Sequence, residues 1–349
     1  MQRMASASKG IAKFITIGTS VEGRPIAGIK IGIDDGQKDV IIFDAGIHAR
    51  EWATVHTALY FINQLLSPSA DESIKEYLKK VVIYILPVLN PDGYEYTRTD
   101  ETNPKYRMWR KNRGKEICTN NVNGEKRCCR GVDLNRNFDF QFGAVGSSRY
   151  VCSEIFHGSS AFSEPETQAI RDLFISLKGR IRAYVTLHSY SQLFIHSYSH
   201  RQNVYPKEID DIRRVASNAV KEIEKMYGTK YRFGTGPEII YGFAGGSTDW
   251  ATEKINVKYS YTIELRPLYT SWNGFVMSPS ELIPTARETW NGVRTIIDEV
   301  INEQPTPIPP SQCIDIQSGC LSWISSSPSL CHSNPASMKR DCAKSCHFC

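Results

Sequence analysis

The sequence predicts an α/β fold, in which a mixed central β-sheet has helices on both faces, plus a small disulfide-rich domain at the C-terminus. Short apolar runs at residues 40–46, 81–88 and 181–187 have the length and composition of strands that are buried on both faces. Helical patterns lie between these runs, and this alternation favours a largely parallel or mixed sheet. The third observation is that six of the ten cysteines lie between residues 313 and 349.

Amphipathic helices are expected at four places. Apolar residues recur at spacings of three and four between Val55 and Leu66, which gathers them on one face of a helix. A similar pattern is present at residues 164–177, 207–227 and 280–302. A chain of 349 residues is long enough for about two domains.

The domain boundary is expected where the composition changes. Residues 305–310 read PTPIPP, and a proline-rich stretch cannot continue a helix and behaves as an extended spacer. The sequence therefore predicts a large domain at residues 1–304, a Pro-rich linker at 305–312 and a disulfide module at 313–349.

The charge pattern excludes two classes of partner. The chain has 42 basic and 37 acidic residues, which gives a net charge of +5 spread along the sequence. We find no basic run of the kind that binds nucleic acid or anchors a protein to a membrane surface. The longest apolar stretches are too short to span a membrane. We therefore expect no nucleic-acid partner and no membrane span.

The cysteines indicate an oxidising compartment. A high and even count, with a dense C-terminal cluster, is typical of a small disulfide scaffold in a secreted protein. A zinc cluster of thiolates is the alternative, but the tail lacks paired Cys-x-x-Cys knuckles. No signal peptide follows Met1, so we expect a secreted protein in a truncated or processed form.

Polar residues follow the first of the predicted strands. His48 follows the apolar run 40–46, and Glu51 comes three residues later, where the helical pattern begins. If this turn is already helical, both side chains share one face. An imidazole and a carboxylate so placed can hold one metal ion, whereas a His-x-x-Glu pair alone is more often a surface pair.

Two further strand ends strengthen the metal hypothesis. His188 ends the run 181–187, and Glu264 ends an alternating strand that begins near Tyr259. Ligand sites in open α/β sheets lie outside the carboxyl ends of the strands. Two histidines and one glutamate leave a zinc position open for water, and a further carboxylate can act as its general base.

Seven motifs fall in order along the large domain. They are HAREW at 48–52, NPDG at 90–93, MWRK at 108–111, DLNRNF at 133–138, HSYSQ at 188–192, GGSTDW at 245–250 and IELR at 263–266. Together they closely resemble the pancreatic-type zinc carboxypeptidases over roughly residues 15–303. The resemblance implies a zinc-dependent exopeptidase that hydrolyses C-terminal residues of peptides and proteins. The additional helical segment that usually precedes residues 23–32 in that family is not expected here.

The resemblance also implies the roles of the reaction centre. His48, Glu51 and His188 match the ligands of one Zn²⁺ ion per catalytic domain. Glu264 matches the general base that deprotonates the zinc-bound water and hands the proton to the leaving amine. Arg110 matches the residue that polarises the scissile carbonyl and stabilises the oxyanion.

Further residues match positions that orient the metal or hold the substrate. Asp133 matches the carboxylate that orients His48. Asn135 and Arg136 match the groups that grip the terminal carboxylate, for which a guanidinium fork is well suited. Tyr241 matches a mobile phenol that closes over that carboxylate. The accessory subsite positions are matched by Arg50, Tyr190 and Phe275.

The residue at the base of the specificity pocket, by the same resemblance, is Thr248. It carries no charge, and burying an unpaired substrate charge against it would be costly. We therefore predict neutral C-terminal residues, aliphatic or aromatic. The alternative is B-type specificity for Lys and Arg, because Gly236 and Ser199 resemble wall positions of the basic-specific branch. Asp249 does not decide the matter, since the family carries an aspartate there regardless of specificity.

Cysteine pairing and backbone geometry follow from the same resemblance. Cys129 and Cys152 align with a disulfide common in the family. Cys118 and Cys128 flank an inserted polar loop and are expected to pair, although exchanging Cys128 for Cys129 is the alternative. Cis peptide bonds are expected at Ser189–Tyr190 and Arg266–Pro267.

The C-terminal module resembles a ShK-type six-cysteine domain. That pattern implies the disulfides Cys313–Cys349, Cys320–Cys342 and Cys331–Cys346. Lys339 is followed by Arg340 rather than tyrosine, which disfavours potassium-channel block. A structural or matrix-binding accessory role is preferred, and any extracellular partner of the module is unknown. Two rival functions stay open: a catalytically weak carboxypeptidase-like binding protein, and a carrier of the ShK-type module.

Overall fold

The computed structural model describes residues 1–67, 72–120, 124–303 and 320–327, and single residues 329, 331, 338, 342, 345 and 346. The chain divides into two compact units. The first comprises Met1–Ile33 and Asp39–Ile301, and the second comprises Asp34–Lys38 and Asn302–Cys349. The proposed linker at 305–312 lies outside the described residues.

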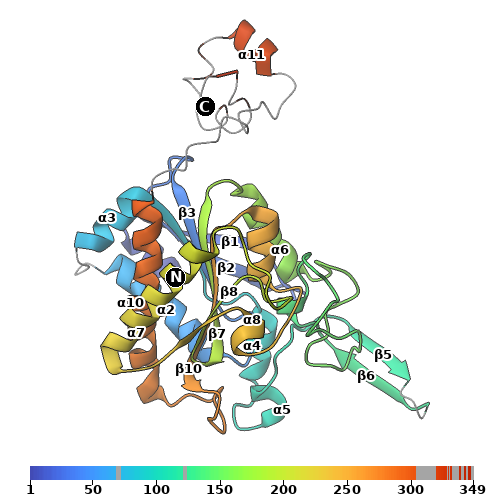
Figure 1. The fold of residues 1–349 in the computed structure, drawn as a ribbon. Helices are drawn as coiled ribbons and strands as arrows, with labels where there is room; N and C mark the ends of the chain where they lie inside the picture. Colours follow the sequence, from blue (N-terminus) through green and yellow to red (C-terminus); the bar gives the residue numbers. More distant parts are fainter. Residues whose placement is uncertain are drawn as a thin grey trace. The chain divides into compact units, whose positions relative to one another are not determined.

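The first unit contains an eight-stranded mixed sheet (Figure 1). Its order is β1-β2-β4-β3-β7-β10-β8-β9, and the central strands β4, β3, β7 and β10 are parallel. The strands are β1 (Ala12–Thr19), β2 (Pro25–Ile31), β3 (Asp39–Asp44), β4 (Val81–Leu86), β7 (Ile181–Ser191), β8 (Leu193–His196), β9 (Arg232–Gly234) and β10 (Tyr259–Leu268). The predicted mixed α/β sheet is confirmed.

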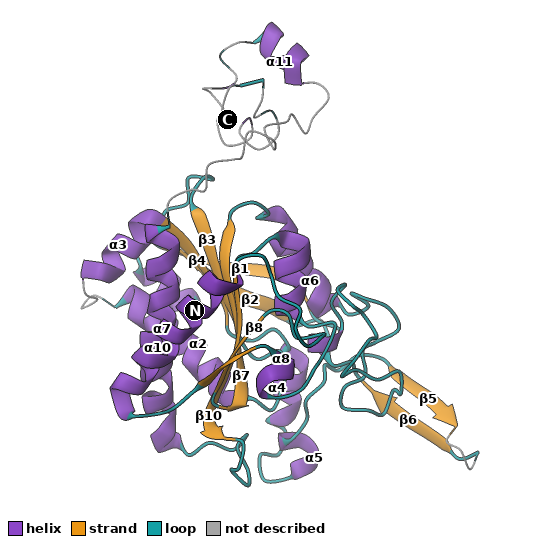
Figure 2. Cartoon of the chain, in the orientation of Figure 1, coloured by secondary structure: helices purple, strands orange, loops and turns teal. Residues whose placement is uncertain are grey.

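Helices cover both faces of this sheet (Figure 2). They are α1 (Gln2–Ala7), α2 (Trp52–Leu66), α3 (Glu72–Lys80), α4 (Pro91–Thr97), α5 (Pro104–Arg107), α6 (Pro165–Ser176), α7 (Ile209–Tyr227), α8 (Gly236–Ile239), α9 (Ser247–Trp250) and α10 (Pro279–Asn302). A 3₁₀ turn, η1, spans Leu134–Arg136, and a π turn, η2, spans Ala251–Ile255. Figures 1 and 2 show α2, α3, α7 and α10 on one side of the sheet and α6 on the other.

Burial on both faces explains the continuous apolar strands. In β3, Ile41 and Phe43 belong to the apolar cluster under α2, α7 and α10, whereas Val40 and Ile42 belong to the cluster under α6. Successive side chains of a strand point to opposite faces, so no polar position is left between them. This packing leaves the strand ends as the places where polar side chains of the central strands can meet.

The helix ends follow local sequence signals. In α4, Pro91 occupies the first turn and the Asn90 side chain accepts a hydrogen bond from the Gly93 N–H, which is the usual start of a helix. Helix α7 ends at Gly228, whose φ of 74° is readily adopted by glycine. Such ends fix where the functional loops begin.

Two expectations need correction. The inserted polar loop is a β-hairpin, in which β5 (Glu116–Asn120) pairs with β6 (Lys126–Arg130) and Cys118 is bonded to the opposite Cys128. Because an isolated two-stranded hairpin is marginally stable in water, this cross-link helps to hold it. A helical segment, α1, precedes β1 and β2, where none was expected, and its residues include good helix formers such as alanine and methionine.

The hairpin is tied to the rest of the first unit by a second disulfide, between Cys129 and Cys152. Its far end points away from the sheet (Figure 1). No helix in the described part of the chain is long and apolar enough to cross a membrane.

The second unit contains helix α11 (Cys320–Ser326). Disulfides join Cys320 to Cys342 and Cys331 to Cys346, and Met338 is buried with Cys342. The expected bond Cys313–Cys349 lies outside the described residues.

Candidate active site

The candidate site lies at the carboxyl ends of the parallel strands β3, β7 and β10. His188 and Glu264 are direct partners in the register of β7 and β10. His48 follows β3 by four residues. The loop that carries it is joined to the loop of Arg110 by a hydrogen bond from the Ala49 N–H to the Arg110 carbonyl. The ends of neighbouring parallel strands thereby bring distant segments to one edge of the sheet.

Three of these side chains form a compact donor set. The Nδ1 atoms of His48 and His188 are 3.1 Å apart. Glu51 places one oxygen 2.8 Å from His48 Nδ1 and the other 3.2 Å from His188 Nδ1. All three residues are buried, and their donor atoms lie within 4.8 Å of one another.

This donor set fits a zinc ion. Ligands at 2.0–2.1 Å around a tetrahedral ion are about 3.3 Å apart, close to the separations between these nitrogen and oxygen atoms. His48 Nε2 lies 3.0 Å from Asp133 Oδ1, a contact that directs the Nδ1 lone pair toward the other donors. Two histidines and one glutamate, with space beside them, are a catalytic rather than a structural zinc arrangement.

The local backbone differs from the predicted helical face. Helix α2 begins at Trp52, and Glu51 lies just before it with φ of −88° and ψ of 60°. The Glu51 N–H donates to the His48 carbonyl over 3.2 Å. A turn before the helix, rather than the helix itself, therefore brings the imidazole and the carboxylate together.

The electrostatics of the donor set follow from burial and proximity. Burial lowers the pKa of His48. Burial also disfavours the charged form of His188, but the Glu51 carboxylate outweighs it and raises the pKa of His188. Although burial favours its protonated form, the two histidines lower the pKa of Glu51 far below its usual range. Glu51 is thus held ionised, as a metal-ligating carboxylate must be.

Asp133 connects the donor set to Arg110. Asp133 is fully buried, and its Oδ2 accepts hydrogen bonds from Arg110 Nε and Nη2 over 3.1 and 2.9 Å. Burial opposes ionisation of this carboxyl, yet Arg110 and His48 lower its pKa well below the usual value. Another nitrogen of Arg110 lies 3.8 Å from Glu51. The Arg110 guanidinium is therefore oriented by the carboxylates of Glu51 and Asp133 and also borders the cavity described next.

A small cavity opens next to this cluster. Its walls are His48, Arg110, Asn135, Arg136, His188, Ile195, Ile240, Tyr241, Phe243, Thr262 and Glu264. Burial raises the pKa of Glu264 to about 7. A carboxyl that titrates near neutrality can both accept and return a proton. The structure thus brings two of the three predicted metal ligands, Glu264, Arg110 and the three predicted carboxylate-binding residues to one cavity.

The predicted carboxylate-binding groups line the same cavity. Asn135 and Arg136 belong to η1, and the Asn135 side chain accepts a hydrogen bond from the Ser247 N–H. Arg136 donates to the Gly146 carbonyl over 2.8 Å and stacks on Phe243, 4.8 Å from the ring centre. Tyr241 is 53% exposed at the mouth. The guanidinium is therefore held by the fold, and the half-exposed phenol lies beside it, with its ring 6.2 Å from that of Phe243.

The accessory residues form one aromatic cluster. The rings of Tyr190 and Phe275 are 4.9 Å apart and nearly perpendicular, and the Arg50 guanidinium lies 4.4 Å from the Phe275 ring centre. The peptide bonds Ser189–Tyr190 and Arg266–Pro267 are cis, as expected, and Ser197–Tyr198 is a third cis bond that was not expected.

Thr248 does not border the cavity directly, but its hydroxyl is 3.4 Å from that of Thr262, which does. Ser199 Oγ accepts a hydrogen bond from the Gly236 N–H over 3.3 Å. Asp249 Oδ2 accepts one from the Ser199 N–H over 2.8 Å. One oxygen of Asp249 is therefore engaged with the backbone of the pocket wall.

Several lining residues were missed by sequence reasoning. Thr262 had a usable signal, because it lies two residues before Glu264 on the same face of β10, and Ile195 pairs with it in β8. Ile240 and Phe243 lie in loops, and no sequence pattern indicated that they line the cavity.

Asn90 was also missed as a support of the site. Its buried amide nitrogen donates to the carbonyls of Ile47 and Lys111 over 3.3 and 3.0 Å. These two residues are neighbours of His48 and Arg110 in the chain. Asn90 therefore holds together the loops that carry the candidate metal ligand His48 and the Arg110 guanidinium.

Comparisons with known proteins agree with this geometry. Residues 1–292 match a family described as zinc carboxypeptidase, and residues 312–349 match a family described as ShK domain-like. Carboxypeptidase A2 of Mus musculus is 38% identical over 301 residues, which cover 86% of this chain and 68% of that protein. Carboxypeptidase B of Astacus astacus is 39% identical over 290 residues, covering 83% of this chain and 90% of that protein.

A solved structure gives the same result for the fold. Bovine thrombin-activatable fibrinolysis inhibitor, in its complex with tick carboxypeptidase inhibitor, superimposes with a TM-score of 0.75 at 34% identity. The match covers 86% of this chain and 94% of that chain.

Proposed function

The chain belongs to the zinc carboxypeptidase family, and from this premise we propose that it removes neutral, aliphatic or aromatic C-terminal residues from peptides and proteins, with one Zn²⁺ ion per catalytic domain. The observation that supports this most is the donor set of His48, Glu51 and His188, within 4.8 Å of one another and beside Arg110 and Glu264. A zinc carboxypeptidase needs metal ligands, a group that stabilises the oxyanion and a general base close together around the scissile bond.

The proposed mechanism assigns the metal to the three buried donors. His48, Glu51 and His188 would hold it, with Asp133 fixing the imidazole of His48. The chemistry that zinc supplies in such a site is Lewis acidity, which lowers the pKa of water to about 7 and polarises a carbonyl.

The proton transfers belong to Glu264. Its carboxylate accepts a proton from the attacking water and then returns it to the leaving amine. The pKa of about 7 that burial gives this carboxyl suits both steps at neutral pH. Arg110 donates hydrogen bonds to the scissile carbonyl oxygen as negative charge develops there, in an orientation that Asp133 already fixes.

Substrate binding is assigned to the far side of the cavity. Asn135 and Arg136 bind the terminal carboxylate, and Tyr241 closes over it. Because Arg136 is anchored to Gly146 and Phe243, its fork is positioned before substrate arrives. Recognition of a free carboxylate explains why only the last residue of a chain is cut.

Specificity is assigned to the pocket around Thr248. The neutral hydroxyls of Thr248 and Thr262, together with Ile195 and Ile240, favour an uncharged side chain. A preference for Lys or Arg is the second candidate. It is favoured by the contact between Ser199 and Gly236, a pair that resembles the basic-specific branch. Peptides ending in Phe, Leu, Lys and Glu separate the two candidates by their kcat/KM values.

The disulfides support an extracellular location, because such bonds persist in oxidising compartments. We assign the ShK-type module a binding role toward an unknown extracellular partner. This assignment is tested by comparing partner binding of the full chain with that of residues 1–304.

The decisive test of the proposed function is metal-dependent hydrolysis. Purified protein should release C-terminal residues from short peptides, lose this activity in a chelator and regain it when zinc is added. Metal analysis should find one zinc per chain. Protein that binds zinc but cuts nothing would instead support the carboxypeptidase-like binding protein.

A further inference from the structure

The segment between β10 and α10 exposes an unusual amount of apolar surface. We call residues 269–278 the rim loop. Trp272 is 97% exposed and Tyr269 is 66% exposed, and the neighbouring Leu268 and Val276 are also exposed. Large apolar side chains gathered on one short loop are typical of a surface that another molecule covers.

The rim loop rests against the accessory cluster of the site. Phe275 packs on Tyr190, which follows the metal-ligand candidate His188 by two residues in β7. The Tyr190 hydroxyl donates to the Ser271 carbonyl over 3.4 Å. At Gly274 an added Cβ would lie 2.3 Å from the Tyr190 ring, so only glycine permits this close approach.

A buried arginine joins the rim loop to the segment that carries Arg50. Arg107 donates hydrogen bonds to the carbonyls of Phe275 and Arg50. The Arg50 guanidinium in turn stacks on Phe275. The rim loop is therefore continuous with residues proposed as accessory subsites.

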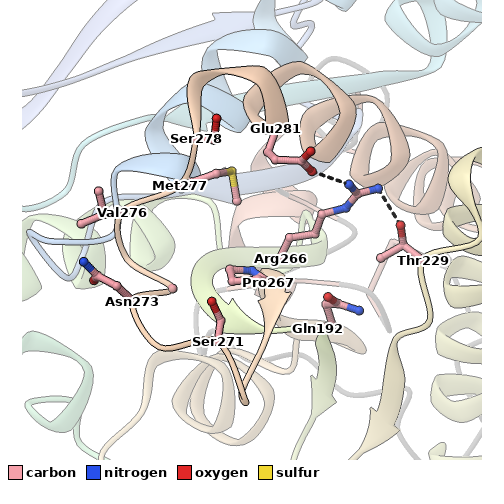
Figure 3. A pocket seen from close by; sticks show the side chains of 11 residues that line it. Gln192, Thr229, Arg266, Pro267, Ser271, Asn273, Val276, Met277, Ser278 and Glu281 are labelled. Atoms are coloured by element: carbon pink, nitrogen blue, oxygen red, sulfur yellow. Dashed lines mark hydrogen bonds and ion pairs between the residues drawn. The ribbon is translucent and has the colours of Figure 1, made fainter.

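The ends of the rim loop are fixed by a second arginine. Arg266 in β10 donates to Glu281 of α10 over 2.8 Å and to Thr229 over 2.6 Å (Figure 3). It also donates to the buried Glu288. Behind the loop lies a cavity of about 450 Å³, whose lining includes Ser271, Asn273 and Met277 (Figure 3).

The residues that hold the rim loop in place are different from the residues that it exposes to solvent. The contacts that hold the loop come from Arg107 and Tyr190, and Arg266 ties the strand before it to the helix after it, whereas Trp272 is 97% exposed. A fully exposed indole contributes little to folding, because its apolar surface stays in water. The exposed side chains are therefore free to serve binding.

We propose that Trp272 and Tyr269 form a second contact for the peptide substrate, which binds an apolar side chain several residues before the scissile bond. The inference rests on the proposed function, because the peptide reaches the rim loop only if its C-terminus is held in the site. An extended peptide advances about 3.3 Å per residue, so its length determines whether the contact forms. Tryptophan and tyrosine are the residues most often found at the energetic centres of interfaces.

The test is a ladder of peptides of two to eight residues with a common C-terminal dipeptide. Each longer peptide is made with leucine or with aspartate at the upstream positions. For the wild type, kcat/KM should rise with length in the leucine series and rise less in the aspartate series. In W272A the value for the long leucine peptides should fall about tenfold through KM, which corresponds to 1.4 kcal/mol of lost binding. Hydrolysis of the dipeptide should be unchanged.

Two matched variants complete the design. Y269A should reproduce the length-dependent loss, whereas I175A, which removes an exposed apolar side chain on α6, should not. Equal activity of W272A and wild type on every peptide overturns the proposal, as does an equal loss on short and long peptides. If the wild type hydrolyses none of the peptides, including the dipeptide, the proposed function itself is contradicted. That result differs from the two outcomes that overturn only the rim-loop proposal, because in both of those the wild type is active.

Discussion

The reaction centre and the rim loop are built in opposite ways, although Tyr190 joins one to the other. In the centre, charged side chains such as Asp133 and Glu51 are almost wholly buried and hydrogen-bonded. In the rim loop, apolar side chains such as Trp272 are exposed. Both arrangements cost free energy in the unbound protein, because one buries charged groups and the other exposes apolar surface to water.

This difference implies that the two regions reach their functional geometry at different stages, one during folding and the other during substrate binding. Burying an ionised group is costly unless partners compensate it, so the fold must fix the geometry of the centre through paired charges before any substrate binds. Exposed apolar surface becomes favourable only when it is covered. The rim loop accordingly gains its contacts during binding, and changes there should alter affinity rather than chemistry.

The largest effect that sharpens this comparison is expected from E264Q. The substitution keeps the size of the side chain and removes its capacity to carry a proton, so kcat should fall by about 10²–10⁴. The peptide-hydrolysis rate measures this loss. KM should change little, because Glu264 is not assigned to substrate binding.

Zinc content and thermal unfolding provide the control for E264Q. Zinc content should equal that of the wild type, since Glu264 is outside the donor set of His48, Glu51 and His188. Thermal unfolding is compared at pH 5, where the buried Glu264 carboxyl is protonated and uncharged like the amide, and should there be close to that of the wild type. If E264Q cuts peptides at the wild-type rate, another residue carries the proton and the assignment is wrong.

A second prediction uses a buried carboxylate with different neighbours. Glu166 in α6 is buried and accepts hydrogen bonds from the Val21 N–H and from the Asn112 amide. Burial raises its pKa from 4.5 to about 7. Glu51 is equally buried, yet the adjacent histidines lower its pKa.

This difference has a measurable pH dependence. The folded protein binds the Glu166 proton more tightly than the unfolded chain, so the carboxyl stabilises the fold fully below pH 4.5. That contribution is lost as the pH rises through about 7. A pKa of about 7 in the folded protein, against 4.5 in the unfolded chain, corresponds to about 3 kcal/mol in the free energy of unfolding.

Urea unfolding of wild type and E166Q at pH 5 to 8 measures it. The difference in unfolding free energy should move in favour of E166Q as the pH rises, whatever constant offset the substitution adds. D172N, at an exposed carboxylate of the same helix, isolates the effect of burial. A difference that is flat with pH would mean that Glu166 titrates normally.

The same contrast explains what sequence alone could predict. His48, His188 and Glu264 were found because they end apolar strands, and strand ends of a parallel sheet meet at one edge. The strands themselves were evident because burial on both faces leaves continuous apolar runs. Residues fixed by such regular packing are accessible to sequence reasoning.

Other features depend on geometry that has no period in the sequence. The turn that joins His48 to Glu51 was expected to be helical, because spacing alone does not distinguish a helix from a turn before one. The role of Asn90 as a tie between two loops and the lining by Phe243 arise from loop conformation. The hairpin of β5 and β6 was missed because its polar residues carry no apolar alternation.

The smallest effect is expected in the specificity pocket, which combines the two regions. Thr248 is buried like the reaction centre, but it is uncharged and its hydroxyl has a neighbour 3.4 Å away. Introducing a carboxylate with T248D should raise kcat/KM for peptides ending in Lys, relative to Phe, about tenfold, as expected for one partly buried ion pair. Asparagine has nearly the same shape as aspartate but no charge, so T248N should leave the Lys-to-Phe ratio of kcat/KM close to that of the wild type.

The wild-type ratio is itself informative. If the wild type already prefers Lys to Phe, the alternative of basic specificity holds, and T248D should then add little because another group supplies the charge. If T248D and T248N shift the ratio equally, shape rather than charge sets the preference. A change of the Lys-to-Phe ratio in T248D alone would mean that the wild-type pocket excludes charged side chains because it offers them no opposite charge. The reaction centre, in contrast, depends on several paired charges.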